Sequence, residues 1–337
     1  MTLYYRPVVR FGGMPRSDSF PLAGGLCWFD EVVVHQRGKQ SWNIPAVDLP
    51  DQVLERLRAP RADVAGLGMA RPRVMGILNV TPDSFSDGGA YLSAEKAVSH
   101  ALGMKEAGAD ILDIGGESTR PGATEVPVAE EISRTVPVIA AVRGETDIPI
   151  SIDTRKSAVA TAALAVGADL VNDVSAFQFD PAMQSVCAAA KVPVCLMHAQ
   201  GTPETMQQDP RYDDVLLDVY DALEARVAAA EAAGIDRAKI VVDPGIGFGK
   251  TLQHNLSLLR GIAMFHALGC PILLGASRKR MIQTLGGGTD AVDRLGGSVA
   301  IALHGARHGV QILRVHDIFE TKQALQLQWA IDGEALI

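Results

Sequence analysis

The stretch IPISIDTRKSAVATAALAVGADLVNDVSA (148–176) contains one complete repeat of the kind from which most of the chain is built. The short apolar run PISID (149–153) ends in an aspartate, an alanine-rich helical segment follows, and ADLVND (168–173) is the next apolar run. Strands that are apolar on both faces are typical of a parallel sheet covered by helices. Gly167 can take the left-handed conformation that ends a helix before the chain turns. The stretch therefore predicts a strand–helix–strand unit.

The same pattern recurs from residue 71 onward. Eight apolar runs end in a polar or small residue, and they are VMGILN (74–79), DILDIG (110–115), PISID (149–153), ADLVND (168–173), VPVCLMH (192–198), KIVVD (239–243), PILLGAS (271–277) and QILRVH (311–316). Helical segments such as Val215 to Gly234 lie between them. Eight strand–helix units predict an α/β fold of the (β/α)8 TIM-barrel type. An open doubly wound sheet is disfavoured, because no GxGxxG motif follows the first strand.

Residues 1–70 differ from this pattern and form a small N-terminal extension. FDEVVVHQ (29–36) predicts a strand, and LPDQVLERL (49–57) predicts a short helix with a proline near its start. A segment of this size buries too little surface to fold alone. We therefore expect it to pack on the main domain, residues 71–337, and the sequence assigns no role to it.

Composition restricts the classes of function. The chain has 337 residues, 47% of them hydrophobic, and a formal net charge of −8, which argues against disorder and against general binding to nucleic acids or anionic membranes. The four cysteines are too scattered for a zinc motif. No apolar run reaches the roughly 18 to 20 residues of a membrane helix, and the first residues lack the apolar core of a signal peptide. We expect a soluble, cytoplasmic protein with no nucleic-acid or membrane partner.

Polar residues stand at the ends of the predicted strands. The active site of a TIM barrel lies at the carboxyl ends of its strands. The residues found there are Asn79, Asp113, Asp153, Asn172, Asp173, His198, Asp243, Ser277 and His316. Any one of them can simply cap the next helix or turn. Because the barrel rim brings all of the ends to one place, we interpret most of them as parts of one site.

Two kinds of ligand fit these residues. Asp113, Asp153, Asn172 and Asp243, together with Lys279, suit a flat, hydrogen-bonding heterocycle, because carboxylates accept paired N–H bonds and lysine donates to a carbonyl. The opposing hypothesis is a divalent-metal site built from the same carboxylates. Lys279 argues against a dense metal cage.

A separate basic pair shares the predicted rim with Asn79. Arg314 and His316 point to the same side of their strand and are typical of a phosphate or pyrophosphate anchor. The alternative is that Arg314 pairs with a core carboxylate. Two long loops, NVTPDSFSDGG (79–89) and GGESTRPGA (115–123), suit lids that exclude water. GIGFGKT (245–251) is not a P-loop, because Pro244 stands where that motif requires glycine.

Eight strings occur in an order that closely resembles the dihydropteroate synthase family. They are GILNVTPDSFSDGG (76–89), DIGGESTRPGA (113–123), SIDTRK (151–156), VNDVSA (171–176), LMHAQGTPETMQ (196–207), DPGIGFGKT (243–251), SRK (277–279) and RVHD (314–317). The resemblance extends from about Val74 to about Leu325 and leaves residues 1–70 outside. It implies a transferase of folate biosynthesis, a sulfonamide target, that condenses 6-hydroxymethyl-7,8-dihydropterin pyrophosphate with p-aminobenzoate to give 7,8-dihydropteroate and pyrophosphate.

The resemblance also implies roles for individual residues. The pterin would be held by Asp153, Asn172, Asp243 and Lys279, between Met197 and Arg314, and the pyrophosphate by Asn79, Arg314 and His316 with Mg2+ beside Asn79. Two loops would close over the site and, with Phe248, form the aminobenzoate pocket, through Asp83, Phe85, Ser118, Thr119, Arg120 and Pro121. We assign catalytic roles to Asp83, Ser118, Thr119, Arg120, Lys279 and Arg314, and substrate binding to Asn79, Asp113, Thr119, Asp153, Asn172, Met197, Asp243, Phe248, Lys279, Arg314 and His316. Arg280 stands where the family often has serine, which leaves the contact to the aminobenzoate carboxylate open.

Three other functions fit the sequence less well. A related pterin-binding methyltransferase would not need both loops, and a silent pterin-binding paralogue would have lost Arg314, His316 or a loop motif. A metal-dependent aldolase is disfavoured by Lys279 and by the lack of a His/carboxylate triad. The family resemblance further implies a homodimer, which we expect to form through late helices such as Val292 to Gly309, whose small residues permit close packing.

Overall fold

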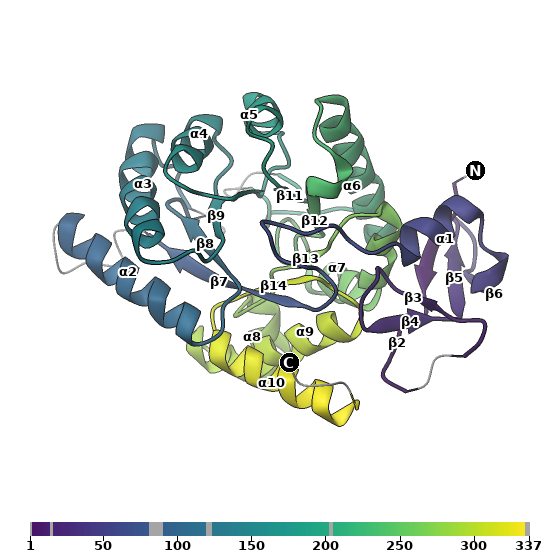
Figure 1. The fold of residues 1–337 in the computed structure, drawn as a ribbon. Coiled ribbons are helices and arrows are strands. Elements are labelled where there is room, and N and C mark those ends of the chain that lie inside the picture. The colour runs from purple at the N-terminus through teal and green to yellow at the C-terminus, as the bar shows by residue number, and fades with distance from the viewer. Residues whose placement is uncertain (1, 14–15, 81–89, 119–122, 202–204, 334–337) are drawn as a thin grey trace.

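The eight predicted strands form one closed parallel barrel. The computed structural model describes residues 2–13, 16–80, 90–118, 123–201 and 205–333. The barrel strands are β7 (Arg73–Asn79), β8 (Ile111–Gly115), β9 (Ile150–Asp153), β10 (Leu170–Asp173), β11 (Val194–Met197), β12 (Ile240–Asp243), β13 (Leu273–Leu274) and β14 (Ile312–Val315). Their order is β12-β11-β10-β9-β8-β7-β14-β13, and a parallel bridge between Val242 and Ile272 joins the two ends (Figure 1). The prediction of a TIM barrel is confirmed.

Helices surround the barrel. They are α2 (Ala90–Glu106), α3 (Val128–Glu145), α4 (Ser157–Ala165), α5 (Ala182–Ala190), α6 (Val215–Ala232), α7 (Leu252–Arg260), α8 (Arg280–Gly286), α9 (Leu295–Arg307) and α10 (Ile318–Ile331). Asp214 caps α6 by accepting from the backbone of Leu216 and Leu217. Gly167, after α4, has φ +107°, as the sequence predicted for a residue that ends a helix. Among the described residues, no helix is long and apolar enough to cross a membrane.

One strand is much shorter than its apolar run predicted. Only Leu273 and Leu274 of the run 271–277 are paired as β13. The chain then leaves the sheet toward the barrel mouth, where Ser277 accepts a hydrogen bond from the backbone N–H of His316 at 3.2 Å. Arg278 follows with φ +58°, a conformation that costs energy for a residue with a Cβ. The end of this run therefore builds the site instead of extending the sheet.

The barrel interior divides into an apolar floor and a polar mouth. Apolar side chains near the amino ends of the strands pack in one cluster, and they are Met75, Ile111, Leu170, Cys195, Val241, Leu273 and Ile312. Val64 and Met69, from the chain before β7, complete this cluster. Because strand side chains alternate, the residue two positions further along β8 or β12 points the same way. These residues are Asp113 and Asp243, so the floor supports a polar layer directly above it.

The extension contains two small antiparallel sheets and a helix. One sheet holds β1 (Tyr4–Pro7), β5 (Glu31–His35) and β6 (Trp42–Pro45), and the other holds β2 (Arg10–Phe11), β3 (Phe20–Pro21) and β4 (Cys27–Phe29). The helix is α1 (Asp51–Arg58). The predicted strand at 29–36 and helix at 49–57 are thus present, with slightly different ends.

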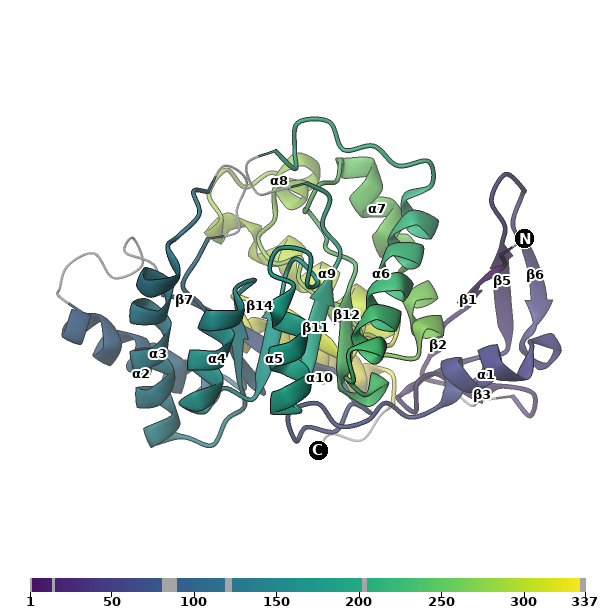
Figure 2. The same ribbon diagram turned by 90° about the horizontal axis from the view of Figure 1, so that it is seen from above.

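The extension packs against the barrel, as expected. Figure 2 shows it beside α6. Tyr4 donates from its hydroxyl to Asp221 at 2.9 Å, and its ring meets that of Tyr220 edge to face. Leu22 and Phe29 belong to the same buried cluster as the residues between the barrel strands and helices. The extension and the barrel therefore share one hydrophobic core.

Candidate functional site

Four predicted site residues converge at the carboxyl end of the barrel. Asp113 lies on β8, Asp153 ends β9, Asn172 lies on β10 and Asp243 ends β12. Their exposed fractions are 0%, 8%, 4% and 5%, respectively. Buried carboxylates require hydrogen-bond or charge partners. Asp113 and Asp153 share one such partner, and Asn172 is hydrogen-bonded to Asp113.

Arg314 on β14 is that shared partner. Its Nε lies 2.5 Å from Oδ2 of Asp113, and its Nη2 lies 2.7 Å from Oδ2 of Asp153. Asn172 donates from Nδ2 to the same oxygen of Asp113 at 3.2 Å. The sequence had placed Arg314 in a separate basic group, and the structure corrects this: the arginine pairs with carboxylates, as the alternative proposed, and the carboxylates belong to the site. The acidic cluster and the basic corner are therefore one network.

Burial shifts the protonation equilibria of this network. Removal from water and the neighbouring acid Asp113 raise the pKa of Asp153 to about 7, although the charge of Arg314 opposes the shift. Burial also raises the pKa of Asp243, against the hydrogen bond that it accepts from the N–H of Gly245 at 2.7 Å. For Arg314, burial opposes the charged form, but Asp113 and Asp153 outweigh it and raise the pKa. A carboxyl group that titrates near neutrality can both donate and accept hydrogen bonds, which suits the edge of a heterocycle.

Lys279 reaches the site beside the loop after β12. Its ammonium group donates to the carbonyl of Ile246 and lies 4.0 Å from the ring centroid of Phe248. Gly247 makes room for it, because a Cβ there would lie 2.9 Å from Lys279 Cδ. Burial lowers the pKa of Lys279 to about 7, while the charge of Asp243 opposes the shift. The structure thus brings together the predicted residues Asp243, Phe248 and Lys279.

Lys250 is part of the site region, although it was not among the residues predicted from the sequence. Its Nζ lies 3.0 Å from Nδ1 of His198 and donates to the carbonyl of Phe248 at 2.9 Å. Burial lowers the pKa of Lys250 to about 7 and that of His198 to about 3. His198 is therefore neutral near pH 7, and the pair ties the end of β11 to the loop after β12. Lys250 belongs to the string GIGFGKT (245–251), which could have indicated its role. That string does not match a P-loop, and so Lys250 was not predicted as a site residue.

A second buried charge network supports the loop that follows β8. Glu117 accepts from Nζ of Lys156 at 2.9 Å and from Nε of Arg155 at 3.0 Å. Lys156 also pairs with Glu131 of α3 at 2.7 Å. These contacts fix the start of the segment 115–123 against the end of β9. The sequence patterns predicted no role for these four residues, because ion pairs between segments that are distant in the chain leave no periodic pattern.

Some of the other predicted residues lie in the part of the chain that the structure describes, and some do not. Met197 is buried and pairs with Asp243 in the sheet register, so it lies at the mouth. Asn79 ends β7 beside Gly115, and His316 approaches Ser277 Oγ with Nδ1 at 3.0 Å. Ser118 is half-buried, and Arg280 is exposed at the start of α8. The remaining loop residues lie outside the described part of the chain, and they are Asp83, Phe85, Thr119, Arg120 and Pro121.

The donors at the mouth fit a lightly held Mg2+ better than a closed metal cage. Within the described part of the chain, no group of three or more His, Cys, Asp or Glu residues is arranged to hold a metal ion. The guanidinium of Arg314 lies against both Asp113 and Asp153. Mg2+ commonly uses one or two protein oxygens and completes its shell with water and substrate phosphates. The amide oxygen of Asn79 meets that requirement.

Fold and site define the class of this chain. The pterin-binding enzyme family matches residues 75–316, which cover all of the barrel strands except the first two residues of β7. The chain belongs to the pterin-binding enzymes and, within them, to the dihydropteroate synthases, as its similarity to curated relatives shows. Dihydropteroate synthase from Escherichia coli K12 is 48% identical over 267 residues, which cover 79% of this chain and 94% of the relative.

Solved structures agree with this membership. Xanthomonas albilineans dihydropteroate synthase with 4-aminobenzoic acid is 48% identical, has a TM-score of 0.77, and aligns over 82% of this chain and 99% of its own. The same enzyme in complex with 7,8-dihydropteroate has a TM-score of 0.74 at 45% identity, over 82% of this chain and 100% of its own. The predicted family, and with it the class of transferase, is confirmed.

Proposed function

We propose that this chain condenses 6-hydroxymethyl-7,8-dihydropterin pyrophosphate with p-aminobenzoate, giving 7,8-dihydropteroate and pyrophosphate. The observation that carries the proposal is the buried Asp113–Arg314–Asp153 network at the barrel mouth, in a chain nearly half identical to dihydropteroate synthases over almost their full length. The network has both the acidic groups that recognise an aminopyrimidinone and the cation that a diphosphate requires.

The pterin is bound by the acidic side of the network. Asp153 and Asp243 take the N–H edge of the ring, Asn172 bonds an adjacent polar atom, and Lys279 donates to the ring carbonyl. Each charged hydrogen bond contributes about 1.5–3 kcal/mol. Met197 lies at the same end of the barrel as an apolar face for the ring. The support is that all five side chains lie at the carboxyl ends of neighbouring strands or in the loops after them.

The diphosphate is bound by the basic side. Arg314 and His316 are two residues apart on or just after β14, and Asn79 ends the adjacent strand β7. Mg2+ held by Asn79 and the diphosphate oxygens would supply positive charge to the leaving group. Phe248 lines the aminobenzoate pocket, with Arg280 close to its rim, and the loop residues 81–89 and 119–122 predicted to complete this pocket lie outside the described part of the chain.

This arrangement catalyses the reaction by position and charge. The C–O bond to the diphosphate breaks, the exocyclic carbon becomes electron-poor, and the electron-rich dihydropterin spreads the positive charge. Arg314 stabilises the departing diphosphate, while Asp153 and Asp243 tolerate the cationic ring. The arylamine nitrogen of p-aminobenzoate then forms the C–N bond and loses a proton. Because an arylamine is weakly basic and neutral at pH 7, its attack needs little help from a general base.

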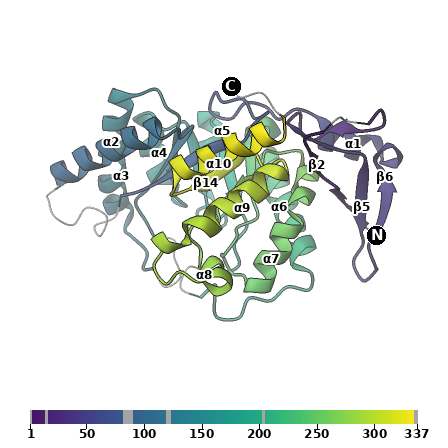
Figure 3. The same ribbon diagram turned by 90° about the horizontal axis from the view of Figure 1, so that it is seen from below.

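Homodimer formation is also part of the proposal. The helix α10 presents apolar side chains to solvent, with exposed fractions of 59% for Phe319, 61% for Leu327 and 69% for Ile331. Figure 3 shows α10 beside α9 on the outside of the barrel. Within α9, Gly297 and Gly305 pack against their own chain, because a Cβ would lie 2.2 Å from Ile282 and 2.7 Å from Leu274, whereas one on Gly296 would have nothing within 4 Å among the described residues. A cytoplasmic location and the division at residue 70 remain predictions.

The test is an assay of pyrophosphate release. With both substrates and Mg2+ present, release should be rapid and should match the formation of dihydropteroate one to one. Omission of p-aminobenzoate should stop the formation of dihydropteroate and greatly slow the release of pyrophosphate. Pyrophosphate release at an unchanged rate without p-aminobenzoate would indicate simple hydrolysis. Binding of the pterin without turnover would indicate a catalytically silent pterin-binding paralogue. Methyl transfer to an acceptor would indicate a related pterin-binding methyltransferase. Either result would reject the proposal.

A further inference from the structure

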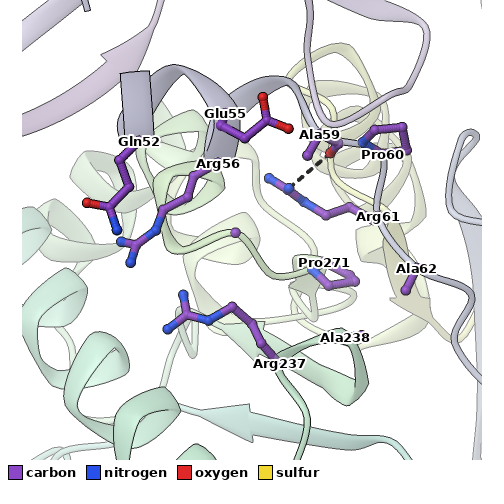
Figure 4. Close-up of a pocket in the computed structure, with 11 residues that line it drawn as sticks. Gln52, Glu55, Arg56, Ala59, Pro60, Arg61, Ala62, Arg237, Ala238 and Pro271 are labelled. Carbon is purple, nitrogen blue, oxygen red and sulfur yellow. Dashed lines mark hydrogen bonds between the residues drawn. The ribbon is translucent and has the colours of Figure 1, made fainter. Parts of the chain in front are cut away.

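A cavity lies on the side of the barrel opposite the proposed active site. Its volume is about 430 Å3, within the range of small-molecule pockets. The helix α1 of the extension forms one wall through Gln52 and Arg56, and Arg237 and Pro271 form the other (Figure 4). Arg237 and Pro271 precede β12 and β13, so the cavity opens at the amino ends of these strands. A ligand bound there would not compete with substrates at the carboxyl ends.

Arg61 is a buried cation that has no acidic partner in the described part of the chain. It lines the cavity and is only 8% exposed. Its Nη1 and Nη2 donate to the carbonyls of Ala59 and His266 at 3.1 and 2.9 Å. Its Nε has no hydrogen-bond partner within the described residues, and none of their carboxylates lies within ion-pair distance of the guanidinium. A buried charge in this condition is costly, and a bound anion would remove much of the cost.

Two further guanidinium groups line the same cavity. Gly269 lies between them, since a Cβ there would be 3.6 Å from Cγ of Arg56 and 3.8 Å from Nη1 of Arg237. Arg237 is held in place by Glu231 at 2.8 Å, whereas Arg56 has only a loose contact of 3.9 Å with Glu224. Glu55 also lines the cavity, but its carboxylate is paired with Arg58 at 2.7 Å. The cavity is therefore richer in positive than in negative charge.

The protonation of Arg61 agrees with this geometry. Burial lowers its pKa to about 10, and the group nevertheless remains charged near pH 7. The rest of the lining includes alanine and proline side chains and so leaves an apolar area beside the charged one. Such a combination suits a small organic molecule that carries an anionic group.

We propose that this cavity is a binding site for a small oxyanion, a phosphate or carboxylate group, with Arg61 as its main partner and Arg56 and Arg237 beside it. The ligand contacts α1 and residue 61 on one side and the barrel on the other. Its binding free energy therefore favours the docked position of the extension and raises the stability of the folded chain. This site does not depend on the proposed catalytic function.

The test follows the side-chain N–H signals of 15N-labelled arginine in the full chain by NMR. Inorganic phosphate and succinate are added in separate titrations, and the Arg61 signal is assigned by its loss in Arg61→Lys. We expect one of the two probes to shift the Arg61 signal in a saturable way, and the stronger probe identifies the anion class. Binding of phosphate at the catalytic site is reported separately by the Arg314 signal. An Arg61 signal that neither probe moves would overturn the proposal.

Two variants of the extension test the cavity without removing a buried group. Arg56→Gln should raise the dissociation constant of the probe about fivefold or more. Arg16→Gln is the matched control, because Arg16 is an exposed arginine of the same extension that pairs with Asp30 and is absent from the cavity wall. It should leave the dissociation constant unchanged. Equal weakening by both variants would attribute the shift to general surface charge and would also overturn the proposal.

Discussion

The guanidinium of Arg314 on β14 lies 2.5 Å from the carboxylate of Asp113 on β8, although 201 residues separate them in the chain. Asp113 is completely buried, so its carboxylate has no contact with bulk water. The same guanidinium reaches Asp153 at 2.7 Å. Arg314 thus stabilises two buried acids of the free protein and also faces the position proposed for the diphosphate. Substrate binding must redistribute these contacts.

Arg314→Ala should abolish turnover, with a loss of at least about a hundredfold in kcat, the scale expected for the loss of a charged group at a developing anion. It should also lower the free energy of unfolding, because Asp113 and Asp153 lose their shared counter-charge. Steady-state kinetics and urea unfolding measure the two effects. Arg314→Lys keeps the charge but cannot bridge both carboxylates, so it should recover stability more than activity. Near-normal kcat in the alanine variant would contradict the assigned role.

Asp243→Ala should also abolish turnover, because it removes a charged contact to the pterin. The dissociation constant for the pterin substrate should rise about ten- to a hundredfold, which calorimetry measures directly. Asp236→Ala is a suitable control, since Asp236 caps the short turn before the same strand at the opposite end of the barrel. It should leave pterin binding unchanged. Equal effects of the two substitutions would indicate a general structural loss instead.

Sulfonamides should compete with p-aminobenzoate. Sulfonamides mimic p-aminobenzoate in this family, so they should occupy the proposed pocket beside Phe248. Rising sulfonamide should increase the apparent KM for p-aminobenzoate and leave kcat unchanged. The same inhibitor should not compete when the pterin substrate is varied. Purely non-competitive inhibition against p-aminobenzoate would place the drug outside the pocket that includes Phe248.

The lowered pKa of Lys250 should make the stability of the folded chain depend on pH. Its pKa is about 7 in the folded chain, against 10.5 as the ordinary value. Between these pH values the unfolded chain binds a proton that the folded chain has lost, so the free energy of unfolding rises with pH by up to about 1.4 kcal/mol per unit. Below pH 7 both states are protonated and this contribution is constant. Urea unfolding at several pH values should show a smaller rise in Lys250→Met than in the natural chain. Identical slopes would show that Lys250 titrates normally.

Lys156→Met tests the network under the loop after β8. The substitution leaves Glu117 and Glu131 without their shared cation in a buried site, so it should cost about 3–5 kcal/mol of unfolding free energy. Arg211→Met, which breaks a pair with Asp209 that is largely exposed, should cost less than about 1 kcal/mol. Denaturant unfolding compares the two. A similar small loss in both variants would mean that the buried pairs do not stabilise the loop.

Much of the fold was predictable because it depends on local patterns. The apolar runs, the polar residues at their ends and the glycines after the helices repeat along the chain, so β8, α4 and α6 could be placed to within a few residues. The length of β13 was not predictable. Its run is as apolar as the others, but contacts of Ser277 with His316 draw the chain away from the sheet.

The barrel and the residues that face its mouth follow from local sequence patterns, because side-chain direction alternates along each strand. The pairing of those residues follows from the folded arrangement. Folding joins Arg314 to Asp113 and Asp153, places Lys156 between two acids, and gives Arg61 no acidic partner among the described residues. Such pairings depend on distances between separate strands and loops, and closure of the barrel and docking of the extension set those distances. Local patterns contain no information about them.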